Sequence, residues 1–276
     1  MLKSLIRLIL LSIILVAIAF GFNDLLVSHF AFHPMKQSEQ TFISEDNIEE
    51  VVIETKEGIR LQAFHLKNKN ADSILVYFHG NAGNAYQRIE HVKQFRNLGL
   101  EVLLLSYRGY GNSEGEPSEQ GVYEDAAAAL HFVNTKLGWD DKKIVIYGRS
   151  IGSAVAINVA QHRNTLKGLI LVTPLQSGRE MAERMGLGWF IRPDKIPFNS
   201  IEKLKNISSP ILFIHGNNDQ VIPIEQGQAL YEAFLGKKVF RVVKGGNHNN
   251  LVGLAGKDFW KWIANFLQDS SSKIIN

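Results

Sequence analysis

The feature that most constrains this chain is a series of six short, nearly continuous apolar runs that alternate with segments of helical pattern. The runs cover residues 73–78, 101–106, 143–147, 168–172, 211–215 and 238–243. Strands that read as unbroken apolar runs are typical of parallel sheets that are buried on both faces. We therefore expect a mostly parallel central sheet that is flanked by helices.

Helical patterns and one hairpin complete this prediction. We expect helices over residues 85–98, 118–137, 151–161, 224–234 and 257–267. Ser118 precedes the second of these and is a suitable N-cap. Before the first apolar run, residues 51–55 and 60–66 alternate apolar and polar side chains on either side of a glycine-containing turn. This alternation predicts an antiparallel hairpin at the N-terminal end of an α/β domain.

Composition excludes several classes of protein. The chain has 276 residues, of which 45% are hydrophobic, and this is enough for one large domain. The 30 Lys and Arg residues nearly balance the 27 Asp and Glu residues, so we expect no nucleic-acid partner. The absence of cysteine excludes disulfides, thiolate metal sites and cysteine nucleophiles. No spaced set of His, Asp and Glu predicts a metal site, and we expect no cofactor.

The N-terminus predicts contact with a membrane. Lys3 and Arg7 precede an apolar run over residues 8–22, and apolar residues continue to Val27. One interpretation is a single-pass membrane anchor with the catalytic domain on the extracytoplasmic side. The other is a signal peptide that is cleaved near Ala19, which gives a secreted or periplasmic protein. The continuation to Val27 favours the anchor.

The sequence divides into four parts. They are an anchor or signal peptide (1–27), a linker (28–47), the α/β domain (48–269) and a tail (270–276). Within the domain, the connection over residues 174–210 is longer than the others. It is either a surface helix that packs on the sheet or a small lid. In the second case, Met185, Leu187, Trp189 and Phe190 form an apolar approach to a substrate-binding site.

A serine follows one of the predicted strands in the sequence GRSIG, residues 148–152. Ser150 is placed between that strand and the predicted helix over 151–161, and the glycines allow a sharp turn that exposes its hydroxyl. A serine hydroxyl is a poor nucleophile near neutral pH unless a histidine and a carboxylate activate it. The hypothesis that Ser150 is a nucleophile therefore requires both partners.

Asp219 and His248 meet this requirement. Each directly follows an apolar strand, and the carboxyl ends of parallel strands meet at one edge of a sheet. Taken alone, either side chain is best interpreted as a solvated loop residue. Together with Ser150 they occur in the order Ser, Asp, His, which is the order expected on this scaffold. We therefore predict a Ser150-His248-Asp219 triad.

A further loop is placed to stabilise an oxyanion. The sequence HGNAGN at residues 79–84 follows the first parallel strand. The backbone N–H groups of Asn81 and Ile151 are the predicted donors to the oxyanion. The alternative is an ordinary glycine turn in which His79 is a buried packing residue.

Two arginines lie near these motifs, Arg108 in SYRGYGNSEG (106–115) and Arg149 beside the serine. Each could pair with a carboxylate or meet an anionic headgroup, and a structural ion pair is the commoner outcome. We interpret the glycine-rich loop that carries Arg108 as a wall near the nucleophile turn.

Taken together, HGNAGN, SYRGYGNSEG, GRSIG and HGNNDQVIP (215–223) resemble the α/β-hydrolase superfamily, from about residue 51 to residue 267. More narrowly, they are similar to the bud-emergence-type, membrane-anchored serine hydrolases, which include depalmitoylating thioesterases and lysophospholipid hydrolases. The resemblance implies Ser150 as nucleophile, His248 as general base then acid, and Asp219 as the orienting carboxylate. The cysteine-rich N-terminal segment of the mammalian depalmitoylating members is absent here.

These observations predict a serine hydrolase that cleaves carboxylic esters or thioesters, including lipid acyl esters, through an acyl-enzyme. Two alternatives remain. The first is a serine peptidase on the same fold. The second is a non-catalytic, membrane-anchored scaffold, which the intact set of Ser150, Asp219 and His248 disfavours.

Overall fold

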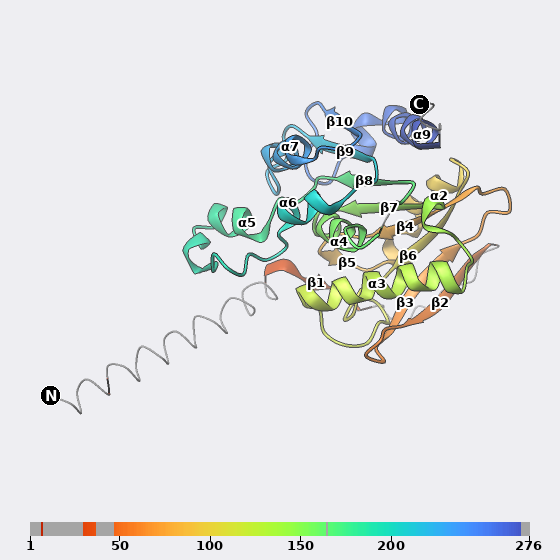
Figure 1. Ribbon diagram of the computed structural model, residues 1–276, viewed down its shortest axis with the longest axis horizontal. Coiled ribbons are helices and arrows are strands. Elements are labelled where there is room, and N and C mark those ends of the chain that lie inside the picture. Colours follow the sequence, from red (N-terminus) through yellow and green to blue (C-terminus); the bar gives the residue numbers. More distant parts are fainter. Residues whose placement is uncertain (1–6, 8–29, 37–46, 164, 272–276) are drawn as a thin grey trace.

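The computed structural model describes residue 7 and residues 30–36, 47–163 and 165–271. Within these residues an eight-stranded sheet forms the centre of the molecule, in the order β10-β9-β8-β7-β4-β6-β3-β2 (Figure 1). The six predicted apolar runs form β4 (Ser73–Phe78), β6 (Leu100–Leu105), β7 (Ile144–Arg149), β8 (Gly168–Val172), β9 (Ile211–Gly216) and β10 (Lys238–Val243). They pair in parallel with one another. The predicted fold class is therefore confirmed.

The predicted hairpin forms the other edge of the sheet. β2 (Ile48–Glu54) pairs antiparallel with β3 (Arg60–Leu66), and β3 pairs antiparallel with β6. The turn between β2 and β3 contains Gly58, whose φ of 82° is a conformation that favours glycine. The sheet is thus mixed, with antiparallel strands confined to its N-terminal part.

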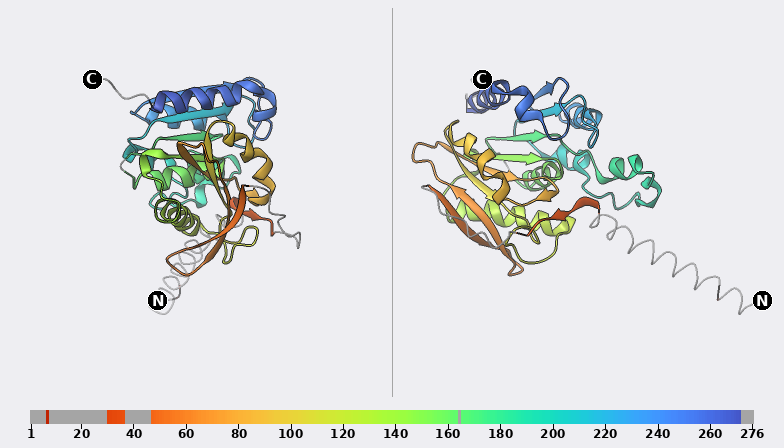
Figure 2. Two further views of the ribbon diagram at one scale, coloured as in Figure 1. Left: turned by 90° about the vertical axis from the view of Figure 1, so that its right-hand side faces the viewer. Right: turned by 180° about the vertical axis from the view of Figure 1, so that it is seen from behind.

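Helices cover both faces of the sheet (Figure 2). One face packs against α3 (Glu119–Thr135), α4 (Ile151–Ala160) and α7 (Ile224–Ala233). The other packs against α2 (Ile89–Arg96) and α9 (Lys257–Ser271). Along each strand, alternate residues pack against the helices on opposite faces of the sheet. Val76 and Phe78 of β4 belong to the first layer, whereas Leu75 and Tyr77 belong to the second.

The described N-terminal arm crosses the carboxyl edge of the sheet. Its strand β1 (His33–Pro34) pairs in parallel with β5 (Ala82–Gly83), which lies in the HGNAGN loop. The predicted anchor or signal peptide lies outside the described residues except for Arg7. Among the residues that the structure describes, none of the helices is long and apolar enough to cross a membrane.

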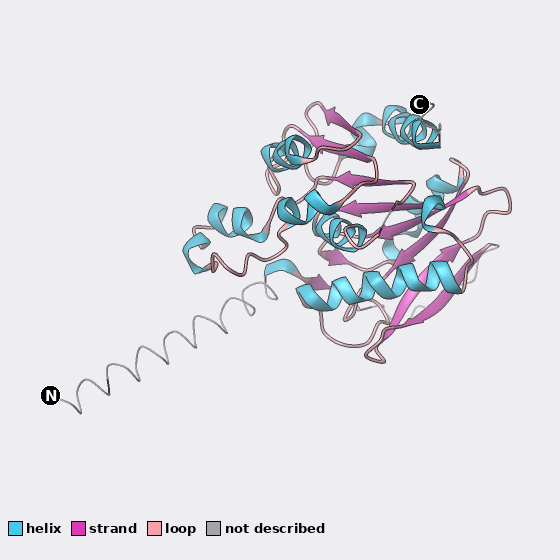
Figure 3. Cartoon of the chain, viewed as in Figure 1, coloured by secondary structure: helices cyan, strands magenta, loops and turns pink. Residues whose placement is uncertain are grey.

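The long connection between β8 and β9 has two parts. The first, with α5 (Gly178–Arg184) and η3 (Gly188–Phe190), extends away from the sheet beside the described N-terminal arm (Figures 1 and 3). The second, with α6 (Ser200–Lys203) and η4 (Leu204–Asn206), packs on the domain, where α6 contacts α4 and α7. The remaining short elements are η1 (Tyr86–Arg88), η2 (Asp141–Lys143) and α8 (Leu251–Ala255).

Candidate active site

Ser150 occupies a sharp turn between β7 and α4. Its backbone has φ 56° and ψ −127°, a conformation that is strained for a residue with a Cβ atom. The two flanking glycines make the turn possible. A Cβ on Gly148 would collide with the carbonyl oxygen of Gly152, and a Cβ on Gly152 would collide with that of Phe78. The turn therefore raises the serine side chain above the carboxyl edge of the sheet.

The structure brings the three predicted triad side chains together. His248 Nε2 lies 3.1 Å from Ser150 Oγ, and His248 Nδ1 lies 2.8 Å from Asp219 Oδ2. Because a carboxylate accepts, Nδ1 carries the proton and donates to Asp219, which leaves Nε2 to accept the hydroxyl proton of Ser150. Each partner lies in the loop after its strand, β9 for Asp219 and β10 for His248.

The Asp219 carboxylate is held by four groups. Oδ1 accepts from the backbone N–H of Val221 and of Ile222, each at 2.9 Å. Oδ2 accepts from His248 and lies 3.5 Å from His215 Nε2. Burial raises the pKa of Asp219, but the N–H groups of His215, His248 and Ile222 that lie against the carboxylate outweigh this effect and hold the pKa well below its usual range. Asp219 is therefore ionised at neutral pH.

His215 is a site residue that the sequence analysis missed. Its side chain is fully buried, and its Nε2 donates to the carbonyl oxygen of Ile222 at 2.9 Å. It thereby closes the turn that carries Asp219. Its position four residues before the aspartate in HGNNDQVIP was the available signal.

The predicted oxyanion donors lie beside the serine. Asn81 and Ile151 both line the cavity at Ser150. Within the described part of the chain, no hydrogen bond uses the backbone N–H of either residue. The loop is held instead through its carbonyl groups, since Tyr110 Oη donates to Asn81 O at 2.7 Å. The N–H of Ile151 is free at the start of α4, and the N–H of Asn81 is free in a loop that is held in place. Both are available to donate to a developing oxyanion.

His79 supports this loop from below. Its ring is fully buried, and Nδ1 donates to the carbonyl oxygen of Gly80 at 2.7 Å. Burial lowers the pKa of His79 to about 4, so the ring is neutral near pH 7. The interpretation of His79 as a buried packing residue is therefore correct, and it is compatible with an oxyanion role for the loop.

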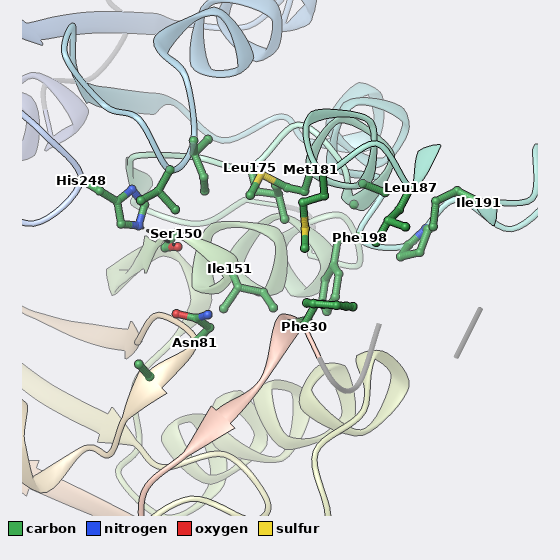
Figure 4. Close-up of a pocket in the computed structure, with 18 of the residues that line it drawn as sticks. Phe30, Asn81, Ser150, Ile151, Leu175, Met181, Leu187, Ile191, Phe198 and His248 are labelled. Atoms are coloured by element: carbon green, nitrogen blue, oxygen red, sulfur yellow. Dashed lines mark hydrogen bonds between the residues drawn. The ribbon is translucent and has the colours of Figure 1, made fainter. Parts of the chain in front are cut away.

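A cavity of about 350 Å³ opens beside Ser150 and extends beneath α5 (Figure 4). Ser150 and His248 lie at one end of it, and Leu187 and Ile191 lie at the other. Its lining is predominantly apolar and includes Phe30, Ala31, Leu175, Met181, Ala182, Met185, Pro197, Phe198, Val221 and Ile222. These residues come from three separate parts of the sequence, 30–31, 175–198 and 221–222.

Of the four residues predicted to form an apolar approach, Met185 and Leu187 line this cavity. Trp189 is 77% exposed and lies outside the lining. The side chain of Phe190 is outside the described part of the structure. The same segment also contributes Met181, which the sequence analysis did not name.

The two arginines have different surroundings. Arg108 forms ion pairs with Asp125 at 2.9 Å, Glu57 at 3.1 Å and Glu124 at 3.3 Å. Arg149 instead donates to the carbonyl oxygen of His248 and to the side-chain oxygen of Asn249, each at 2.8 Å. Arg108 therefore has a structural role in the glycine-rich wall, whereas Arg149 contacts the loop of His248.

A serine at a strand-to-helix turn, with histidine and aspartate after later strands of a mostly parallel sheet, defines the class of α/β serine hydrolases. The comparisons agree with this class. A family described as serine aminopeptidase, S33, matches residues 69–192. The α/β-hydrolase domain-containing protein WAV2 of Arabidopsis thaliana is 31% identical over 241 residues, which cover 80% of this chain and 78% of that protein. The chain belongs to the α/β-hydrolase superfamily, and it is a serine hydrolase.

The names of other similar proteins refer to a membrane or to a lipase or esterase. An uncharacterized membrane protein of Saccharomyces cerevisiae is 34% identical over 227 residues, 79% of each chain. The lysophosphatidylserine lipase ABHD12 of Danio rerio is 33% identical over 184 residues, 59% of this chain and 48% of the lipase. An esterase of Pyrococcus furiosus has the same fold, with a TM-score of 0.73 at 17% identity over 88% of this chain and 98% of its own.

Proposed function

We propose that this chain hydrolyses carboxylic esters or thioesters of apolar acyl groups through an acyl-enzyme on Ser150. The observation that carries the proposal is the continuous hydrogen-bond chain from Asp219 through His248 to Ser150, which ends at the mouth of an apolar cavity. The chain of hydrogen bonds supplies an activated nucleophile, and the cavity supplies a place for an acyl group.

The reaction proceeds in two halves. As Ser150 Oγ attacks the acyl carbon, His248 Nε2 takes the hydroxyl proton, and the N–H groups of Asn81 and Ile151 donate to the oxyanion. His248 then gives this proton to the leaving oxygen or sulfur as its bond to the acyl carbon breaks. In the second half His248 takes a proton from water, which attacks the acyl-enzyme. The acid departs, and Ser150 regains its proton.

The cavity favours an apolar acyl group over a peptide. None of the described residues that line it is an aspartate or a glutamate, so a peptide's charged amino terminus would be buried there without a counter-ion. This supports ester or thioester hydrolysis over the aminopeptidase activity in the name of the matching family. The lipase activity named for the zebrafish relative points in the same direction. In this proposal, residues 174–210 act as a small lid over the acyl group.

We also propose that residues 1–27 tether the catalytic domain to the extracytoplasmic side of a membrane. Lys3 and Arg7 before the apolar run support this orientation, and the yeast relative is named as a membrane protein. Protease added outside intact cells should digest the domain, and mass spectrometry should find the N-terminal peptide still attached. Loss of that peptide would instead indicate a cleaved signal peptide.

A fluorophosphonate probe tests the nucleophile without knowledge of the substrate. Wild type should be labelled, whereas Ser150→Ala should not, because the probe requires an activated serine hydroxyl. His248→Ala should also lose labelling although it keeps the serine. Arg241→Gln is the matched control, since Arg241 is an exposed residue of β10 outside the cavity, and it should label like wild type. Labelling of a folded Ser150→Ala would refute the assignment.

A further inference from the structure

Two arginines at the catalytic edge of the sheet, Arg88 and Arg149, have no carboxylate partner among the residues that the structure describes. Arg149 follows Tyr147 by two residues in β7, so it shares the face that is covered by α2 and α9. Arg88 ends η1 and caps the start of α2, on the same face. The acyl cavity extends away from Ser150 beneath α5 (Figure 4), whereas these arginines adjoin its catalytic end.

The hydrogen bonds of both guanidinium groups fix this position. Arg149 Nη2 donates to His248 O and Asn249 Oδ1, each at 2.8 Å, and Arg88 Nη2 donates to Ala82 O at 3.0 Å. All three acceptor residues line the cavity at Ser150. One arginine therefore contacts the histidine loop and the other contacts the oxyanion loop.

No counter-charge in the described part of the chain lies within ion-pair distance of Arg88 or Arg149. Burial lowers the pKa of Arg88, and the positive charge of Arg149 acts in the same direction. The nearby rings of Tyr77 and His91 do not compensate. Burial raises the pKa of Tyr77 and lowers that of His91 to about 4, so both are neutral near pH 7. The pair therefore presents two uncompensated positive charges.

We propose that Arg88 and Arg149 form an anion-binding subsite for the leaving group of the substrate. This inference rests on the proposed function, in which the apolar acyl group occupies the cavity beneath α5. The leaving group then lies at the catalytic end, beside the two loops that the arginines contact. The substrate class is an ester or thioester that joins an apolar acyl chain to a leaving group with a phosphate or carboxylate. Guanidinium groups suit both anions because they donate in a planar fork.

Three dodecanoyl esters test the subsite, each below its critical micelle concentration. The leaving groups are glycerol, glycerol 3-phosphate and glycerate, which are neutral, phosphate-bearing and carboxylate-bearing. Wild type should have the higher kcat/KM for the anionic esters. Arg88→Gln should lower kcat/KM about 10-fold or more for whichever anion binds, since one charge-assisted hydrogen bond is lost. The glycerol ester should lose less than the anionic esters, and its loss reports the hydrogen bond from Arg88 to Ala82 in the oxyanion loop.

Arg149→Gln should reduce the same preference and also lower kcat for all three esters, because Arg149 holds the carbonyl of His248. Because each arginine holds a loop of the catalytic site, the ratio of kcat/KM between anionic and neutral esters measures the subsite in both variants. Arg184→Gln is the charge-matched control. It removes one positive charge from α5, where Arg184 donates to the carbonyl of Gln220, and it should leave the preference unchanged.

Protection from the fluorophosphonate probe gives a second measurement that needs no turnover. Glycerol 3-phosphate should slow labelling of wild type but not of Arg88→Gln, and glycerol should slow neither. An unchanged preference and unchanged protection in Arg88→Gln would overturn the subsite while the proposed function stands. Failure of wild type to label and to hydrolyse any of the three esters would overturn the proposed function itself.

Discussion

The two sides of Ser150 differ in how they are built. On one side, Met181, Phe198 and other apolar side chains from separate segments enclose a cavity, which we propose selects the acyl group by its shape. On the other side, Arg88 and Arg149 are held by hydrogen bonds to carbonyl and amide oxygens, and we propose that they bind the leaving group through their charge. The two proposals together predict an amphiphilic substrate whose two halves are recognised independently. Variants should therefore separate acyl preference, leaving-group preference and chemistry.

Asp219→Asn should have the largest effect on kcat, and the loss should be the same for esters with neutral and with anionic leaving groups. The amide would present an N–H where His248 Nδ1–H now donates, which disfavours the tautomer that the reaction needs. We expect kcat to fall by roughly 10⁴-fold for every ester. The ratio of kcat/KM between anionic and neutral esters should stay as in wild type. A change in that ratio would mean that Asp219 also contributes to leaving-group recognition.

Arg108→Met tests whether any nearby arginine would serve as well as Arg149. Arg108 is 9% exposed and pairs with Asp125, whose side chain is fully buried. Removal of the cation leaves that carboxylate unpaired, and we expect a loss of about 3–5 kcal/mol in the free energy of unfolding. Urea denaturation measures this loss. In the folded fraction the preference for anionic esters should persist, and its disappearance would assign Arg108 a part in binding.

Residues that come directly after a strand could be placed from the sequence. Each of the six apolar runs became a strand, and Ser150, Asp219 and His248 could be located because each comes right after one. Parallel topology then brings strand ends together whatever the intervening sequence. The catalytic roles of these residues remain predictions, which probe labelling and ester turnover test.

The surroundings of the triad were harder to predict because they depend on contacts between distant segments. Phe30 and Phe198 line one cavity although 168 positions separate them in the sequence. Trp189 was a natural choice for an apolar lid, yet its side chain points to solvent. Arg88 had no local signal, since its partner is the backbone carbonyl of Ala82. For Arg149, the structure shows hydrogen bonds to the His248 loop in place of the ion pair that is the commoner outcome.

Ala182→Trp should have the smallest effect and should alter the acyl side alone. Ala182 lines the cavity from α5, and an indole there would occupy space that a long acyl chain needs. Overpacking of this kind amounts to about 1–3 kcal/mol, so kcat/KM for dodecanoyl esters should fall about 10-fold or more. Acetyl esters, which need only the catalytic end of the cavity, should be cleaved as in wild type.

The leaving-group preference is the informative control for this variant, and Arg184→Gln is its companion on the same helix. If the two sides are independent, Ala182→Trp lowers the rates of the neutral and anionic dodecanoyl esters by the same factor, because the arginines are untouched. An equal loss on acetyl and dodecanoyl esters would instead show that the acyl chain does not enter the cavity beneath α5. A loss confined to anionic esters would show that the two sides are coupled through Ser150, since the substituted residue contacts neither arginine.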